Sequence, residues 1–403
     1  MLTKILTPLL LTSLLSLSAI AKEEAPKAKK SHGPELKFTW KSTFGSSKKD
    51  IAKSVVALDG GDVAILGTCR TSKGFGHGRE DLCVIRVNAK GKTIWRQAFG
   101  GKKRDLAGGL TLTSDGNLVA VGYGESFNKG GDKDAYIVKL DTNGKLLWQR
   151  AYGGDDAETL HGVAPTKDGG IIAVGTTESF GKGEKDIYIF RLDKNGEKVW
   201  QKTFGGKRND IANAITPASD GNFIFAGASS SYNNGDLDFY ISKITPDGKQ
   251  IWAKAYGEEP DDVMNGITAT QDGGCVVVGA TESYGSKHDD VDVMKLDSKG
   301  EQVWQRLYGF KSIEYANDVV PTPEGGFLVV GTTKSMGHGK YDFYVIELDP
   351  KGHLHWGNLY GGANKDIAHG VAKTKRGTFV IVGETKSFGN GDADFFMVEL
   401  KKR

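Results

Sequence analysis

The string DKNGEKVWQKTFGG at residues 193–206 recurs along the chain with small changes. Two close relatives are DTNGKLLWQRAYGG from Asp141 and DSKGEQVWQRLYGF from Asp297. All seven tryptophans of the 403-residue chain follow this pattern, at separations of 55, 53, 52, 52, 52 and 52 residues. A fixed spacing of this length indicates a tandem structural repeat.

Each repeat reads as four short β-strands. In residues 210–257 the apolar run DIANAITPA is followed by the turn SDGN and the alternating run FIFAGASS. A glycine-rich loop, SYNNGDLD, then leads to FYISKI, the turn TPDGK and QIWAKAYG. Glycine turns between β-forming runs are hairpin signals. Seven such units predict an all-β fold, a seven-bladed β-propeller of four-stranded antiparallel blades.

The two ends of the chain hold complementary parts of one blade. The last unit stops after FFMVEL (395–400) and lacks a fourth strand, whereas LKFTWKSTFG (36–45) is a fourth strand with nothing before it. Pairing the two closes the ring, which an open solenoid would not need. We expect the propeller to span residues 36–403. Its blades are predicted at about 50–99, 105–152, 156–204, 209–256, 261–308, 314–360, and 366–400 plus 36–44.

The first 21 residues resemble an export signal. Lys4 is followed by the apolar stretch ILTPLLLTSLLSLSAI and an A-x-A site, which predicts cleavage after Ala21. A transmembrane anchor is the alternative, but the stretch is short and broken by Pro8. Residues 22–35 are polar and are expected to form a flexible leader. The protein is therefore expected in the periplasm or outside the cell, with no membrane span after cleavage.

The composition argues against some functions, and the sequence holds few motifs that point to a function. The formal net charge is only +3, which argues against a nucleic-acid binder. The sequence holds no G-x-S-x-G, H-E-x-x-H or P-loop, so we name no catalytic residue and favour a protein that is not an enzyme. The acidic string HDDVD could hold Ca²⁺ through Asp289, Asp290 and Asp292, although it lacks the twelve-residue calcium-loop pattern. No other metal or cofactor is expected.

Two acidic columns recur in every repeat and are expected to brace loops by accepting backbone N–H groups. One opens the third strand: Asp81, Asp134, Asp186, Asp238, Asp290, Asp342 and Asp394. The other precedes the first strand: Asp50, Asp105, Glu158, Asp210, Asp262, Glu314 and Asp366.

A third column varies between blades and is the candidate ligand site. Three positions after the acid of the innermost strand, at the channel, the side chains form a polar crown: Lys53, His161, Asn213, Asn265, Asn317 and His369, with Gly108 in the second blade. This crown could bind an anion or a small polar ligand. The alternative is that these groups hydrogen-bond between blades. Two histidines without ligand spacing do not make a zinc site.

Charged loops at the channel mouth are the candidate interaction surface. Blades one, two and four carry cations: Lys48, Lys49, Lys102, Lys103, Arg104, Lys207 and Arg208. Blades three and five carry acids: Asp155, Asp156, Glu258, Glu259, Asp261 and Asp262. This asymmetry could steer an anionic partner. The alternative is ordinary solvated loop charge.

The three cysteines divide into a pair and a single residue. Pairing Thr71 with Asp81 in the first blade would place Cys69 opposite Cys83, where directly opposed Cβ atoms can form a disulfide. An oxidising compartment would favour that bond. Cys275 lies in the apolar run CVVVG and is expected to be a buried free thiol.

The repeat resembles a known group of propellers. The consensus W-x3-[FY]-G-G, D-G-G, V-G-x-T-x-S-[FY]-G and D-x-Y-x-x-[KR]-L-D-x-x-G is similar to that of secreted bacterial and archaeal seven-bladed propeller repeats, described as delta-60-like, quinoprotein-like or kelch-like. The resemblance covers residues 36–400 and implies the fold. It implies no activity, because the chain lacks the cofactor-binding acids and vicinal disulfide of quinoprotein dehydrogenases.

Two functions follow as expectations. The first is an exported, monomeric, non-enzymatic scaffold that binds a protein or envelope component through the loop face around the channel. The second is a small-ligand or glycan receptor, or a hydrolase or lyase, that uses the crown of the channel.

Overall fold

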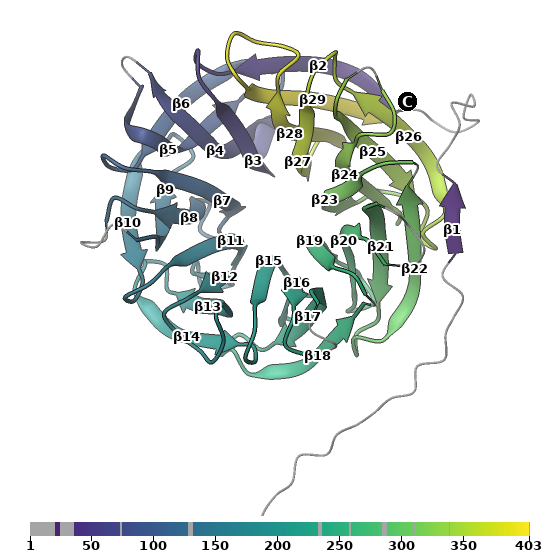
Figure 1. The fold of residues 1–403 in the computed structure, drawn as a ribbon. Coiled ribbons are helices and arrows are strands. Elements are labelled where there is room, and N and C mark those ends of the chain that lie inside the picture. The colour runs from purple at the N-terminus through teal and green to yellow at the C-terminus, as the bar shows by residue number, and fades with distance from the viewer. Residues whose placement is uncertain are drawn as a thin grey trace, which may run out of the picture.

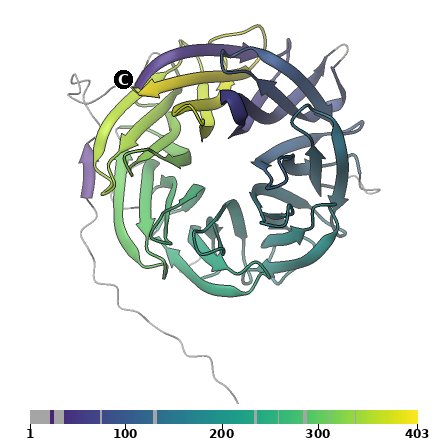
Figure 2. The ribbon, with the colours of Figure 1, turned by 180° about the vertical axis from the view of Figure 1, so that it is seen from behind.

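The molecule is a closed ring of seven β-sheets around a central axis, where the predicted channel lies (Figures 1 and 2). The computed structural model describes residues 21–24, 36–72, 75–127, 132–232, 236–257, 259–283, 288–309, 311–337 and 339–402. In every blade the first strand lies at the channel and the fourth at the outer rim. The predicted seven-bladed propeller of four-stranded antiparallel blades is confirmed.

The blades follow one another along the chain, and their strands have these bounds. Blade 1 holds β3 Asp50–Ala57, β4 Val63–Ser72, β5 Phe75–Val87 and β6 Thr93–Phe99, with the 3-10 turn η1 Asp59–Gly61. Blade 2 holds β7 Asp105–Leu112, β8 Leu118–Gly124, β9 Asp134–Leu140 and β10 Leu146–Tyr152. Blade 3 holds β11 Glu158–Pro165, β12 Ile171–Thr177, β13 Asp186–Leu192 and β14 Lys198–Phe204. Blade 4 holds β15 Asp210–Pro217, β16 Phe223–Ser229, β17 Asp238–Ile244 and β18 Gln250–Tyr256.

The remaining blades have the same order. Blade 5 holds β19 Asp262–Ala269, β20 Cys275–Thr281, β21 Asp290–Leu296 and β22 Gln302–Gly309. Blade 6 holds β23 Glu314–Pro321, β24 Phe327–Thr333, β25 Asp342–Leu348 and β26 Leu354–Tyr360. Blade 7 holds β27 Asp366–Lys373, β28 Thr378–Thr385, β29 Asp394–Lys402 and, from the other end of the chain, β2 Leu36–Phe44.

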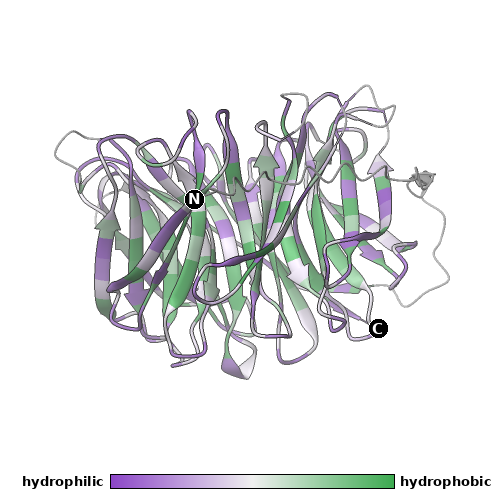
Figure 3. Cartoon of the chain, turned by 90° about the horizontal axis from the view of Figure 1, so that it is seen from below, coloured by the Kyte–Doolittle hydropathy of each residue, from purple (hydrophilic) through white to green (hydrophobic). Residues whose placement is uncertain are grey.

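Local sequence explains the hairpins. The SDGN turn of blade 4 is closed by a hydrogen bond from Gly221 N to Ala218 O at 3.1 Å. Gly221 has a φ of 85°, a left-handed conformation that glycine adopts without the clash of a Cβ atom. The second and third strands of the blades are almost wholly buried, whereas most residues of the fourth strands are exposed or half-buried. Figure 3 shows the same division, with apolar residues in the body of the ring and polar residues in the loops at both ends.

The hydrophobic core lies between blades. Phe343 of blade 6 packs against Phe396 of blade 7, with ring centroids 5.1 Å apart, and both belong to one buried cluster that spans the two sheets. Because each sheet buries its faces against its neighbours, an open ring would expose two apolar faces to water. Closure of the ring is therefore a requirement of the core.

Closure follows the predicted route. The strand β2 pairs antiparallel with β29, and Trp40 lies opposite Glu399 and Thr43 opposite Phe396. The first and last segments of the propeller thus lie side by side at the rim (Figure 1). The hydrogen-bonded segment extends to Lys402, two residues beyond the predicted end of the third strand.

One short strand lies outside the seven-blade pattern. β1, Ala21–Glu24, pairs parallel with the outer edge of β22, with Ala21 opposite Arg306. The sequence predicts a flexible leader over residues 22–35, so this strand is a difference from that prediction. The rest of the predicted signal peptide (1–20) and leader (25–35) lies outside the described residues. Within the described ranges, no helix has the length and apolar character to span a bilayer.

Candidate functional site: the channel crown and its loop face

Each crown residue occupies an irregularity in its inner strand. The pairing between first and second strands skips one residue in six blades, and the skipped residues are Lys53, His161, Asn213, Asn265, Asn317 and His369. Such a β-bulge leaves one residue without a partner in the ladder and redirects its side chain. Blade 2 skips two residues, Gly108 and Gly109. The crown is therefore a ring of bulges, which the sequence repeat located but did not explain.

The three asparagines join neighbouring blades. Asn213 Nδ2 donates to Met264 O at 2.9 Å, and Asn265 Nδ2 donates to Ala316 O at 2.9 Å. Asn317 continues the series by donating to Ala368 O at 2.6 Å. Of the two interpretations of the crown, the structure supports hydrogen bonding between blades for this half of it. Each such bond is worth about 1 kcal/mol net.

The other half of the crown is basic. Burial within the channel walls lowers the pKa of His161 to about 4, and the charge of Lys53 adds to this shift. The ring of His161 is nevertheless open to solvent in the channel and lies 3.1 Å from Thr159 Oγ1. Burial also lowers the pKa of His369 well below 6.5, assisted by Lys53 and two further lysines. Both imidazoles are therefore neutral at neutral pH and can act as hydrogen-bond partners.

Lys53 is the cation at the centre of this basic half. Burial lowers its pKa, the nearby Glu384 carboxylate opposes that shift, and Lys49 and Lys365 add to it. Glu384 itself lies 3.5 Å from Lys365 Nζ. A positive group held in a desolvated channel attracts an anion more strongly than the same group in bulk water.

A further polar residue of the channel wall was missed by sequence reasoning. Asp318 follows the bulge of blade 6 and accepts hydrogen bonds from Val371 N at 2.9 Å and Val319 N at 2.8 Å. Burial raises its pKa to about 6. Ser54 accepts from Leu110 N in the corresponding place at 3.3 Å. Ser54 and Asp318 occupy the same place in the repeat, four positions after the acid of the first strand, where the other five blades have glycine or alanine. That contrast is the signal in the sequence that could have identified them.

A pocket opens where the crown meets the loops of blades 2 to 4. It has a volume of about 310 Å³ and is lined by His161 and Asn213 together with Lys133, Lys185 and Glu178. Lys185 Nζ lies 3.5 Å from Glu178 Oε1. The structure thus brings two of the six predicted crown residues into one pocket and adds two lysines that sequence analysis did not select. Its size falls at the small end of the range for ligand sites.

Acidic braces hold the loops above the channel. Asp186 Oδ2 accepts from both Lys182 N and Gly183 N at 2.8 Å. Asp210 Oδ2 accepts from Gly206 N at 2.8 Å and from Ser231 Oγ at 2.7 Å. The predicted bracing role of these two columns is confirmed at these positions. Their function is structural, since carboxylates bound to backbone N–H groups fix the course of the loop.

The loops that carry the predicted cations share one face. Parallel bridges join the loop before the first strand to the loop before the third strand: Lys49 to Ala393, Glu80 to Arg104, Lys185 to Asn209 and Tyr341 to Lys365. All seven predicted cations are exposed to solvent: Lys48, Lys49, Lys102, Lys103, Arg104, Lys207 and Arg208. Arg104 also pairs with Glu80 at 3.2 Å.

The acidic loops of this face are exposed as well. Asp155 and Asp156 of blade 3 and Glu259 and Asp261 before blade 5 are open to solvent. Asp262 instead belongs to the buried bracing column, and Glu258 lies outside the described residues. The face therefore combines clustered cations on some blades with clustered acids on others.

The predicted disulfide is present, but the strand register differs from the predicted one. A disulfide joins Cys69 and Cys83, whose Cα atoms are 5.8 Å apart. The register behind that prediction is wrong, because Cys69 lies opposite Asp81 and Cys83 opposite Gly67; the bond crosses the hairpin diagonally. Thr71 is displaced because the strand pairing shifts between Arg70 and Ser72. Cys275 is buried, as predicted.

The calcium prediction for Asp289, Asp290 and Asp292 gains no support from the geometry. Asp292 is fully buried in the blade and bonded to Gln305. Among the residues that the structure describes, no group of three or more His, Cys, Asp or Glu side chains is arranged to hold a metal ion.

Comparison with known proteins gives one family match and one curated relative. A family model described as "Outer membrane protein assembly factor BamB" matches residues 78–237. The regulatory protein FlaEY of Caulobacter vibrioides is 25% identical over 178 residues, which is 38% of this chain and 18% of that protein. The match thus covers less than a fifth of the length of FlaEY.

Solved propellers match most of the chain. The Pan2 WD40 domain of Neurospora crassa matches with a TM-score of 0.54 at 10% identity, over 86% of this chain and 88% of that chain. A protein of unknown function from Dyadobacter fermentans matches with a TM-score of 0.52 at 12% identity, over 91% and 99%. At such identities the likeness shows the fold alone. Together with the family match, the seven-bladed fold confirms the resemblance of this chain to the quinoprotein-like β-propeller superfamily.

Proposed function

We propose that the protein is an exported, non-enzymatic scaffold that binds a protein or cell-envelope partner through the loop face around the channel. The observation that carries the proposal is the set of exposed cations on that face, Lys102, Lys103 and Arg104 foremost. They stand on loops whose backbone is fixed by the acidic braces. A charge pattern on a rigid frame selects its partner at a small entropic cost.

The charge pattern suggests what the partner presents. Clustered cations attract an acidic surface, and the acidic loops of blades 3 and 5 repel it from the rest of the face. The partner is therefore expected to carry an asymmetric acidic patch. The names of the two similar proteins, an outer-membrane assembly factor and a regulatory protein, are consistent with a protein partner.

Export rests on the sequence of residues 1–21. Sequencing the N-terminus of the mature protein tests it, and the expected first residue is Lys22. A mature chain that begins at Met1 and remains in the cytoplasm would remove export from the proposal.

The experiment on the binding face is quantitative capture from envelope extract. The test variant replaces Lys102, Lys103 and Arg104 with serine. A matched variant removes three exposed lysines from turns at the opposite end of the ring: Lys145, Lys194 and Lys299. The loop variant is expected to lose at least one partner that the wild type and the matched variant retain, and the loss should mirror the effect of added salt. Equal capture of every partner by all three proteins would refute the role of this face.

A second candidate function is supported by the 310 Å³ pocket at the channel mouth. In that case the protein is a receptor for a small polar or anionic ligand, such as a glycan. A thermal-shift screen with sugars, anions and divalent ions tests it. A stabilising compound whose effect is abolished in the His161→Ala and His369→Ala variants would favour this function over the scaffold.

A further inference from the structure

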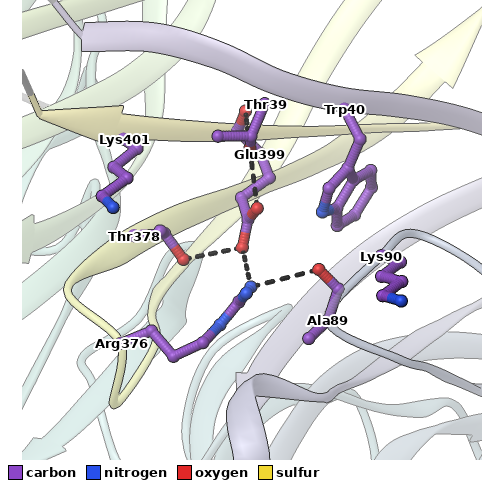
Figure 4. A pocket seen from close by; sticks show the side chains of 8 residues that line it. All are labelled: Thr39, Trp40, Ala89, Lys90, Arg376, Thr378, Glu399 and Lys401. Atoms are coloured by element: carbon purple, nitrogen blue, oxygen red, sulfur yellow. Dashed lines mark hydrogen bonds and ion pairs between the residues drawn. The ribbon is translucent and has the colours of Figure 1, made fainter.

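The seam at which the ring closes contains a pocket. Its volume is about 400 Å³, and Figure 4 shows its side chains converging from three segments. Trp40 comes from β2, Glu399 and Arg376 come from blade 7, and Ala89 and Lys90 come from the turn between β5 and β6 of blade 1.

In blades 1 to 4 the indole N–H of the corresponding tryptophan donates a hydrogen bond to the next blade. Trp252 Nε1 donates to Ser298 O at 3.1 Å, in the turn that joins the third and fourth strands of blade 5. The tryptophans of blades 1, 2 and 3 do the same: Trp95 to Thr142 O at 2.9 Å, Trp148 to Lys194 O at 3.1 Å and Trp200 to Pro246 O at 3.1 Å. The interaction thus recurs in four consecutive blades.

At the seam this interaction is broken. Ala89 holds the turn position of Ser298, but Ala89 O accepts from Arg376 Nη2 at 3.3 Å. Trp40 Nε1 is buried and has no hydrogen-bond partner among the described residues. Its ring still lies under Gly91, as the ring of Trp252 lies under Gly300. The indole is therefore in its usual place with its donor unused, a state that costs free energy unless another acceptor is supplied.

The one carboxylate of the pocket is already occupied. Glu399 Oε2 accepts from Thr39 Oγ1 at 2.6 Å, and Oε1 accepts from Thr378 Oγ1 at 2.7 Å and from Arg376. These bonds are drawn in Figure 4. Lys90 and Lys401 line the same pocket and are exposed. Three cationic side chains thus face one carboxylate, and the excess charge is positive.

We propose that the seam pocket binds a small ligand that carries a carboxylate. The carboxylate accepts the hydrogen bond of Trp40 Nε1, and Lys90 and Lys401 provide the opposite charge at the entrance. The pocket volume suits a ligand the size of an acidic monosaccharide or a short peptide. The ligand would contact β2, blade 7 and blade 1 at once, so it would also hold the ring closed.

The test observes the indole N–H directly. Protein with ¹⁵N-labelled tryptophan is titrated with galacturonate and, separately, with N-acetylglycylglycine, whose free C-terminus is the only carboxylate. Galactose and the C-amidated dipeptide are the uncharged controls. The Trp40 signal, assigned with Trp40→Phe, is expected to shift saturably with at least one of the acids, while the Trp252 signal stays in place. The responding acid identifies a sugar or a peptide source.

Two variants separate binding from folding. Lys90→Gln combined with Lys401→Gln alters only exposed residues and is expected to weaken binding by about tenfold. Lys299→Gln is the matched control, because Lys299 holds the place of Lys90 in the turn beside Trp252, and it should leave the affinity unchanged. The ligand should also raise the melting temperature of the wild type but not of the double variant. The proposal is overturned if Trp40 responds to neither acid, or responds equally to the uncharged controls.

Discussion

A buried acid in blade 5 should make the stability of the ring fall as pH rises. Asp292 lies in β21, at the position that four other blades fill with tyrosine: Tyr136, Tyr188, Tyr240 and Tyr344. It is fully buried, and Oδ2 accepts from Gln305 Nε2 at 2.5 Å. Oδ1 is buried without a hydrogen-bond partner among the described residues. An ionised carboxylate in this place is therefore poorly compensated.

The sign and size of the effect follow from linkage. Burial raises the pKa of Asp292 well above 3.8, and the neighbouring Asp262 adds to the shift. In the unfolded chain the group ionises near its ordinary pKa of about 3.9. Above that pH the folded state holds one more proton than the unfolded state, so the free energy of unfolding decreases as pH rises. The slope reaches about 1.4 kcal/mol per pH unit until the folded-state pKa is passed.

The Asp292→Asn variant isolates this contribution. Asparagine has the same shape and does not titrate, and the Gln305 amide can turn to match it. Urea unfolding of both proteins from pH 3.5 to pH 7.5 should show the variant gaining stability relative to the wild type as pH rises above about 4. The exposed Asp155→Asn serves as the control and should show no such trend. A wild-type minus Asp292→Asn difference that is independent of pH would refute the reasoning.

Three further predictions concern stability. Lys402→Met should lower the free energy of unfolding by about 2 kcal/mol, because Lys402 Nζ lies 2.8 Å from the almost buried Glu347 carboxylate. The same change in a Glu347→Gln background should cost much less, and an equal cost in both backgrounds would show that the ion pair does not contribute to stability. Reducing the Cys69–Cys83 disulfide, which closes a loop of 14 residues, should cost about 3 kcal/mol in thermal unfolding. Asn265→Ala should cost about 1 kcal/mol in urea unfolding through its inter-blade hydrogen bond, and an unchanged midpoint would contradict that role.

The fold was predictable because the residues that determine it occur in every repeat. One tryptophan every 52 to 55 residues and the split blade at the termini are visible in the sequence, and both depend on the need of every sheet to bury two faces. The bracing acids were predictable for the same reason. A residue that occurs seven times at one place reports a constraint of the backbone.

Features set by local geometry were not predictable. The bulges at Lys53 and Asn265 each depend on one unpaired residue, and the register between Cys69 and Cys83 depends on where such a shift occurs. A one-residue change in pairing alters which side chains are opposed without changing the hydrophobic pattern. The role of Asp318 depends on contact with the next blade, and no spacing within one repeat reveals it.

The departures from repetition gather where the chain ends meet. The residue opposite each tryptophan is basic in blades 1 to 5, and it pairs with an aspartate of the turn between first and second strands, as in Lys243 with Asp220 at 2.7 Å. In blades 6 and 7 this residue is Glu347 or Glu399.

The reversal of charge bears on how the ring selects its closing strand. Strands of similar sequence could compete for the free edge of β29, because every blade has a fourth strand built on the same pattern. Glu399 Oε2 accepts a hydrogen bond from Thr39 Oγ1 of β2 at 2.6 Å, whereas the fourth strands of blades 1 to 5 carry valine, isoleucine or leucine at the position of Thr39. Those side chains offer no hydrogen bond to a buried carboxylate, so a wrong strand would leave Glu399 under-satisfied. The same residues that make the seam pocket therefore also favour the correct closure of the ring.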